Sequence, residues 1–255
     1  GIYAYNAGAK TINNAGTWDI QTDADTTYYL GTLTINNSGS LTKSAGTAVS
    51  ILHGLNNTGT VTVNSGTLQL ADGGTGSYTH SGAFSVATGA TLDFNSGTHT
   101  LTAASSYAGA GTLSISGGAV TANGTGTVTQ LNMSGGTAVF STIGLTNTLT
   151  QSGGTLSTNN ANTLGTVTLS GGTLNGTANT TINTAFNWSG GTLGGSGTFT
   201  AASGSTTTLS SGNWKYLGDT VTLTNNGTMV TDATGTTGIY AYNAGAKTIN
   251  NAGTW

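Results

Sequence analysis

The stretch GTVTVNSGTLQL, from Gly59 to Leu70, decides the fold of this chain. It holds two short runs that begin with Gly-Thr and then alternate apolar and polar residues, with Asn and Ser between them. Alternation with a period of two is typical of half-buried β-strands, and Gly, Asn and Ser are typical of turns. The same element recurs as GTLTI from Gly31, GTLSI from Gly111 and GTVTL from Gly165. No helical pattern competes with it, so the sequence predicts an all-β protein.

Paired asparagines before turns indicate the length of the repeating coil. Successive pairs are offset by 23, 20 and 25 positions (36 − 13, 56 − 36 and 250 − 225). The sequence therefore predicts a single-stranded parallel β-solenoid, or β-helix, with three short strands and about 20–25 residues per coil. Identical side chains stacked in successive coils can form an amide ladder. The predicted ladder residues are Asn13, Asn14, Asn36, Asn37, Asn56, Asn57, Asn225, Asn226, Asn250 and Asn251.

An exact internal repeat divides the chain. The segment GIYAYNAGAKTINNAGTW, from Gly1 to Trp18, returns unchanged from Gly238 to Trp255, an offset of 237 positions (238 − 1). We therefore expect residues 1–237 to form one complete solenoid repeat unit of about 11 coils, and residues 238–255 to begin the next identical unit. The predicted unit junction contains Gly1, Tyr3, Tyr5, Trp18, Gly238, Tyr240, Tyr242 and Trp255.

Hydrophobic residues are placed for a narrow core. Alternating pairs such as Leu33 and Ile35, or Leu68 and Leu70, would point inward from successive strands, with Thr or another polar residue between them pointing outward. A chain rich in Gly, Ser and Thr could instead be disordered. Against that stand the 35% hydrophobic content, its regular alternation and the absence of Pro, which would remove hydrogen bonds from interior strands. These features favour an ordered solenoid.

The charge of the chain excludes some classes of function. Only 4% of the residues are charged, namely four Lys and seven Asp, giving a formal net charge of −3. Nucleic-acid binding needs clustered Lys and Arg, so no nucleic-acid partner is expected. No apolar run is long enough to span a membrane, and no retained signal peptide is expected in this segment. The chain has no Cys.

Several runs resemble the strand repeats of a known group of proteins. They are VNSGTLQL (63–70), MSGGTAVF (133–140), LSGGTLNGT (169–177) and WSGGTLGGSGTFT (188–200). These runs resemble bacterial autotransporter passengers and filamentous-haemagglutinin-like giant secreted adhesins. The resemblance implies a right-handed parallel β-helix, secretion to the bacterial cell surface, and a role as a surface fibre, adhesin or biofilm-matrix component. It transfers no catalytic or ligand-binding residue.

Few residues in this sequence are candidates for catalysis or for metal binding. Polysaccharide-degrading β-helices need clustered acids, but here the only close group is Asp19, Asp23 and Asp25. These carboxylates could bind Ca²⁺ through oxygen ligands, or they could form a polar loop between coils. The three histidines, His53, His80 and His99, show no spacing typical of a metal site or a catalytic triad. No catalytic residue and no cofactor is therefore expected, with Ca²⁺ as the one alternative.

Two binding functions remain open. If Tyr3 and Tyr5 are exposed, they could stack on glycans, although aromatic side chains can also fill the core. The Thr-x-Thr triplets at Thr32, Thr60, Thr166 and Thr220 resemble those of ice-binding β-helices, but they recur irregularly. We expect a structural extracellular filament or adhesin stalk, built from units stacked end to end and associating laterally with itself. A glycan-binding module, with host or matrix glycans as partners, or an ice-binding module is the alternative, and a polysaccharide-degrading enzyme comes last.

Overall fold

The computed structural model describes residues 2–210, 213–231 and 238–255. Within these ranges every regular element is a β-strand, and the strands form stacked coils with about 11 turns in total and three sheets per coil. The predicted all-β parallel solenoid is confirmed. The chain divides into two compact units, an N-terminal half, Gly1–Thr129, and a C-terminal half, Gln130–Trp255. The repeated segment 238–255 lies in the C-terminal half.

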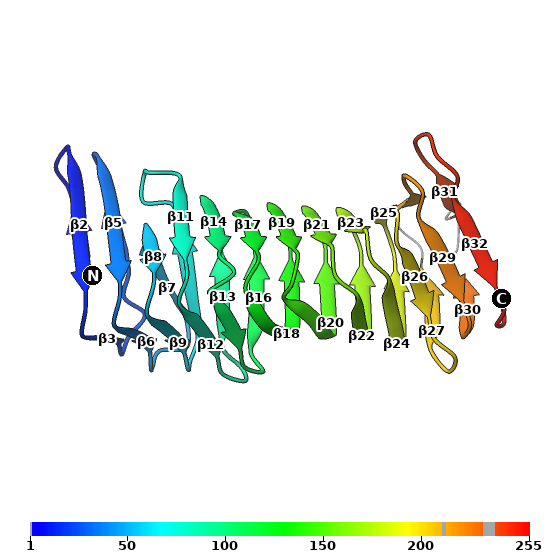
Figure 1. Cartoon of the computed structure of the whole chain (residues 1–255), viewed down its shortest axis with the longest axis horizontal. Coiled ribbons are helices and arrows are strands. Elements are labelled where there is room, and N and C mark those ends of the chain that lie inside the picture. The colour runs from blue at the N-terminus through cyan, green and yellow to red at the C-terminus, as the bar shows by residue number, and fades with distance from the viewer. Residues whose placement is uncertain (1, 211–212, 232–237) are drawn as a thin grey trace. The chain divides into compact units, whose positions relative to one another are not determined.

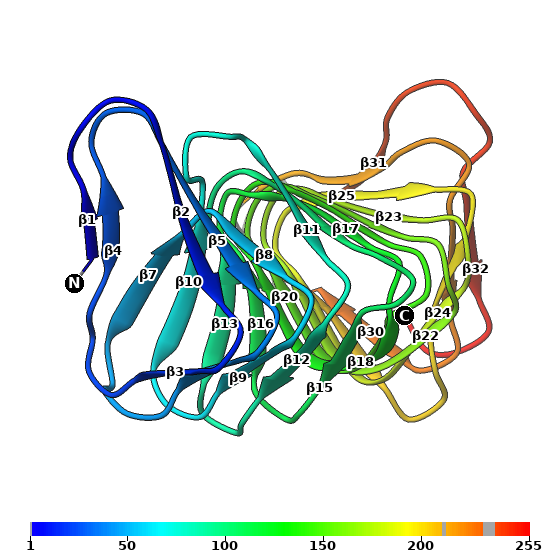
Figure 2. The ribbon, with the colours of Figure 1, turned by 60° about the vertical axis from the view of Figure 1, so that its left-hand side comes forward.

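Three parallel sheets surround the core of the N-terminal half (Figures 1 and 2). The first contains β2 (Ala9–Asn14), β5 (Thr32–Asn37), β8 (Leu55–Asn57), β11 (Ser77–His80), β14 (Thr98–Leu101) and β17 (Ala119–Ala122). The second contains β3 (Thr17–Ile20), β6 (Ser40–Lys43), β9 (Thr60–Val63), β12 (Ala83–Val86), β15 (Ser106–Ala108) and the first residues of β18 (Thr125–Met133). The third contains β7 (Val49–His53), β10 (Thr67–Ala71), β13 (Thr91–Phe94) and β16 (Thr112–Ile115). A separate parallel pair joins β1 (Ile2–Ala4) to β4 (Thr26–Tyr28).

The register of these strands matches the predicted coil length. Ile12 lies opposite Ile35, and Ile35 lies opposite Leu55, so successive coils differ by 23 and 20 positions (35 − 12 and 55 − 35). Identical or similar apolar side chains therefore stack on one another along the core. Leu33 and Ile35 are 1% and 0% exposed, as the alternation predicts.

The C-terminal half has the same parallel pairing with a different division into strands. One sheet contains β19 (Thr137–Phe140), β21 (Thr155–Thr158), β23 (Thr173–Gly176), β25 (Gly191–Gly195), β28 (Lys215–Leu217) and β31 (Ile239–Ala241). A second sheet contains the longer strands β20 (Gly144–Gln151), β22 (Asn162–Leu169) and β24 (Thr180–Trp188), which pair in this order. Two rows of short strands follow them, β26 (Thr198–Ala201), β29 (Thr222–Asn225) and β32 (Thr248–Asn251), and β27 (Thr206–Leu209) and β30 (Thr228–Thr231).

Coils are shorter than predicted in the middle of this half. Leu156 lies opposite Leu174, an offset of 18 positions (174 − 156). The spacing of the asparagine pairs predicts about 20–25 residues per coil. The reason for the difference is that β22 turns a corner without a loop. Its alternation of buried and outward residues breaks at Gly165, where the register with β24 shifts as in a β-bulge.

The core contains most of the large apolar side chains. Trp188, Phe94 and Phe140 are fully buried, at 0% exposed, and inward Leu, Ile and Val fill the space between them. No helix in the described part of the chain is long and apolar enough to cross a membrane.

Candidate functional site

The repeated segment occupies the edge of a solenoid in each half. In the N-terminal half its strands β1, β2 and β3 pair with the later strands β4, β5 and β6. In the C-terminal half β31 and β32 pair with the earlier strands β28 and β29, and Thr254 bridges to Thr228 in β30. We call residues 2–20 the N-terminal edge coil and residues 238–255 the C-terminal edge coil. Of the predicted junction residues, Gly1 lies outside the described residues.

An inner asparagine ladder runs through the N-terminal half at the ends of β2, β5 and β8. The Nδ2 of Asn14 donates to the Oδ1 of Asn37 over 2.7 Å, and the Nδ2 of Asn37 donates to the Oδ1 of Asn57 over 2.7 Å. Asn37 and Asn57 are 1% and 0% exposed. In the next coil His80 lies opposite Asn57, and the amide ladder ends there.

An outer row of asparagines lies on the solvent side of the same strands. Asn36 donates to the Oδ1 of Asn13 over 3.0 Å, and Asn56 donates to the Oδ1 of Asn36 over 3.4 Å. These three side chains are exposed or half-buried. The two members of each asparagine pair therefore have different surroundings.

The asparagine ladder in the C-terminal half has a spacing one position longer than the predicted 25 (250 − 225). Asn225 donates to the Oδ1 of Asn251 over 2.8 Å, whereas Asn250 lies opposite Thr224. The stacked asparagines are thus offset by 26 positions (251 − 225), because Asn225 is the last residue of β29 and Asn226 already belongs to the turn.

Aromatic side chains gather at both edge coils. Tyr3 and Tyr5 are 62% and 64% exposed, and the ring centroids of Tyr5 and Tyr29 are 6.3 Å apart. In the C-terminal half the same two residues, Tyr240 and Tyr242, are 42% and 55% exposed. Here the rings of Trp214 and Tyr216 lie beside them, with centroids 3.9 Å and 5.4 Å from Tyr240 and Tyr242 respectively. Trp18 is half-buried, and Trp255 is 58% exposed.

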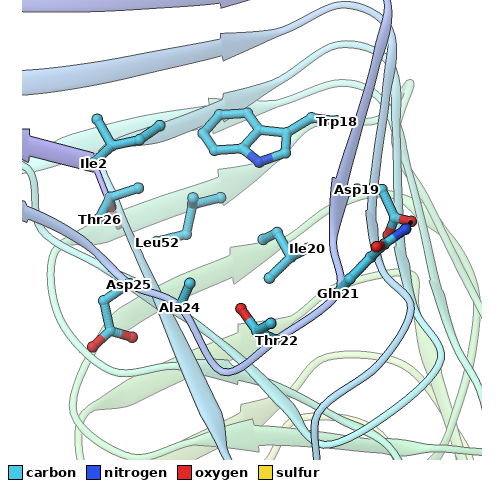
Figure 3. Close-up of a pocket in the computed structure, with 10 residues that line it drawn as sticks. All are labelled: Ile2, Trp18, Asp19, Ile20, Gln21, Thr22, Ala24, Asp25, Thr26 and Leu52. Atoms are coloured by element: carbon cyan, nitrogen blue, oxygen red, sulfur yellow. Dashed lines mark hydrogen bonds between the residues drawn. The ribbon is translucent and has the colours of Figure 1, made fainter.

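The N-terminal edge coil leaves part of the core uncovered. A cavity of about 200 Å³ lies here (Figure 3). It is lined by Ile2, Trp18, Asp19, Ile20, Gln21, Thr22, Ala24, Asp25, Thr26 and Leu52. A second hollow beside it is lined by Ile12, Asn14 and Trp18 among others. Both hollows include Ile2 and Trp18, whose strands β1 and β3 pair with the later strands β4 and β6, so the hollows lie at the first coil of the described stack.

The three carboxylates considered as Ca²⁺ ligands each contact a different group of the protein. Asp19 accepts a hydrogen bond from Gln21 over 2.8 Å, Asp23 pairs with Lys43 over 3.0 Å, and Asp25 accepts from the backbone N–H of Ile51 over 2.7 Å. Figure 3 shows Asp19 and Asp25 on opposite sides of the cavity. Within residues 2–210, 213–231 and 238–255, no group of three or more acidic, His or Cys side chains is arranged to hold a metal ion.

All four lysines cap backbone carbonyls of loops, a role that sequence reasoning missed. Lys10 donates to the carbonyls of residues 6–8, and Lys247 repeats these contacts at residues 243–245. Lys215 and Lys43 are fully buried and reach the carbonyls of Ser210 and Ala45. The hydrogen bond from Lys43 holds the pKa of Asp23 below its usual value. The sequence carried a signal, because Lys43 and Lys215 each stand two residues from an inward-facing Leu.

A buried histidine pair is the second feature that the sequence did not reveal. The Nε2 of His99 lies 3.0 Å from the carbonyl of Ser96 and must donate to it, so its Nδ1 accepts from the Nε2 of His80 over 3.1 Å. Both rings are fully buried and therefore neutral. Burial lowers the pKa of His80 to about 3, and its Nδ1 has no hydrogen-bond partner among the described residues. His53 belongs to another contact, between its Nδ1 and Thr26.

Threonine triplets form only short regular patches. Thr148 and Thr150 lie opposite Thr166 and Thr168, but the next coil places Ala185 and Asn187 at these positions. Thr206 and Thr208 follow in the coil after that. The flat face that ice binding requires is therefore interrupted after two coils.

Comparisons of the chain with family models, with curated proteins and with solved structures found no match.

Proposed function

We propose that this protein is a structural component of an extracellular filament or adhesin stalk, built from identical β-solenoid units stacked end to end. The observation that carries the proposal is the placement of the repeated segment, which forms an edge coil in each half. One copy is bonded to later strands and the other to earlier strands, so a tandem array would use both sets of contacts.

The chemistry of the chain supports a mechanical role. In a parallel solenoid every interior strand is hydrogen-bonded on both sides, with neighbouring strands about 4.8 Å apart. The lysines are occupied by loop carbonyls, and the net charge is only −3. A weakly charged surface opposes association less than a highly charged one, so the rods would bundle laterally. Secretion to a bacterial surface follows from the resemblance to autotransporter passengers and filamentous adhesins, with which the solenoid fold is compatible.

Electron imaging of longer chains tests this function. Chains of one, two and three units should appear as straight rods of constant width that lengthen by roughly 50 Å per unit of about 11 coils. Particles joined like beads at flexible hinges would contradict the proposal.

Glycan binding is a second candidate, because a hollow on the outer surface of the C-terminal half is lined by Thr192, Tyr216 and Tyr242. Exposed tyrosine rings can stack on sugar faces while a nearby hydroxyl accepts or donates a hydrogen bond. A glycan array with the native chain and with Tyr242→Ala would test it. Binding that survives this substitution, or no binding by the native chain, would remove this candidate.

A further inference from the structure

We infer that the N-terminal edge coil pairs with strands β28, β29 and β30 of a preceding copy of this unit. The register would be the one in which β31, β32 and Thr254 pair with these strands in the C-terminal half. This inference rests on the proposed end-to-end stacking and specifies its contacts. The repeated segment is seen twice, each time with a different neighbour, so its two sets of contacts can be compared residue by residue.

The backbone hydrogen bonds of the two copies are complementary. In the N-terminal half the carbonyl of Asn14 accepts from the N–H groups of Ser38 and Gly39 in the following coil, over 2.9 and 3.0 Å. In the C-terminal half the N–H groups of Ala252 and Gly253 donate to the carbonyl of Asn225 in the preceding coil, again over 2.9 and 3.0 Å. The bonds run in the same direction, from the later coil to the earlier one. A segment with a coil on each side can therefore make both sets without conflict.

The side-chain ladder is complementary in the same way. Asn14 uses its Nδ2 as a donor to Asn37, whereas its counterpart Asn251 uses its Oδ1 as the acceptor for Asn225. An amide group offers both functions at once. In an array the ladder would pass from Asn225 through the Asn14 position to Asn37 and Asn57.

Glycines stacked in successive coils support the same preceding coil. A Cβ atom placed on Gly39 would lie 2.1 Å from the carbonyl oxygen of Gly16 in the coil before it, and one on Gly253 would lie 2.0 Å from that of Gly227. A Cβ on Gly16 itself would meet nothing within 4 Å. Gly39 and Gly253 each lie against the backbone of the coil before them, whereas Gly16 does not. A preceding coil would place a backbone carbonyl against Gly16, as Gly227 does for Gly253.

Apolar and aromatic surfaces fit the same arrangement. The hollows beside Ile12 and Trp18 are open in the N-terminal edge coil, while Leu223 and Met229, which precede the C-terminal edge coil, point inward and are 0% and 2% exposed. Tyr3 is 62% exposed, but its counterpart Tyr240, which has the earlier strand β28 beside it, is 42% exposed. At the tyrosine positions, an earlier coil therefore covers part of the surface that the N-terminal edge coil exposes.

Cysteine pairs in a chain of two units test the inference, because the native chain has no Cys. The chain consists of residues 1–237 followed directly by residues 1–255. One variant combines Thr224→Cys of the first unit with Asn13→Cys of the second, and another combines Asn13→Cys and Asn36→Cys within the second unit. Both pairs should form disulfides on mild oxidation, since neighbouring parallel strands lie about 4.8 Å apart and disulfides need Cα separations below about 7 Å.

The control variant moves one cysteine out of register. Thr222→Cys of the first unit with Asn13→Cys of the second should stay reduced, because two residues add about 6.6 Å along the strand. The Asn13–Asn36 pair repeats a register already seen within one unit and serves as the positive control. Absence of the Thr224–Asn13 disulfide, or formation of the Thr222–Asn13 disulfide, in a chain that images as one straight rod would overturn the register and leave the filament proposal standing. Two separate particles per chain would overturn both.

Discussion

The Nδ2 of Asn37 donates to the Oδ1 of Asn57 over 2.7 Å, and both side chains are buried between successive coils. Asn37→Ala removes this donor and also the acceptor of Asn14. We expect a loss of about 2–3 kcal/mol in the free energy of unfolding, because buried amide groups are left without partners. Urea denaturation measures it. Asn36→Ala, in the exposed outer row, is the matched control and should cost less than about 0.5 kcal/mol. Equal losses in the two variants would contradict a specific role for the inner ladder.

Glycine is required where one coil touches the carbonyl of the coil before it. Gly39→Ala should destabilise the N-terminal half by about 2 kcal/mol or more, since its Cβ would lie 2.1 Å from a backbone oxygen. Gly16→Ala, on open space in the same stack of glycines, should leave the thermal unfolding midpoint within about 1 °C of the native value. A large fall with Gly16→Ala in the single chain would show that this stack tolerates no side chain even without a preceding coil.

The buried ammonium group of Lys43 depends on Asp23. Asp23→Ala removes the carboxylate 3.0 Å from the Lys43 Nζ and leaves a buried charge without its counter-ion. The midpoint of urea denaturation should therefore fall, although by less than for a fully buried pair, because the Asp23 side chain is 35% exposed. The double variant Asp23→Ala/Lys43→Met should recover part of the fall. A double variant that is less stable than Asp23→Ala would contradict this account.

The histidine pair makes stability depend on pH. The pKa of His80 is lowered to about 3 in the folded protein from an unfolded value near 6.5, so the neutral ring favours the folded state. This contribution is complete above pH 6.5 and is lost as the pH falls toward 3, by up to about 1.4 kcal/mol per pH unit. Chemical denaturation at pH 7.0, 6.0 and 5.0 measures the slope. His80→Phe should flatten the slope between pH 6.5 and 5, and an unchanged slope would contradict the assignment to this ring.

Much of the fold follows from local pattern, because alternation decides which side chains face inward and turn residues decide where strands end. Leu33 and Ile35 lie in the core as predicted. The same rule would have placed Lys43 inside, but a buried lysine is unexpected until its carbonyl partners are known. The prediction of coil length was wrong around Gly165, because a strand can turn a corner at a bulge with no turn loop to mark it. The His80–His99 contact joins residues of successive coils, and only the register brings them together.

The most direct test of the central claim is electron imaging of the assembled material with its averaged power spectrum. An uninterrupted solenoid predicts a meridional reflection near 4.8 Å together with an axial repeat of roughly 50 Å for each unit of about 11 coils. Discrete particles of one unit's length without that axial repeat would contradict end-to-end stacking.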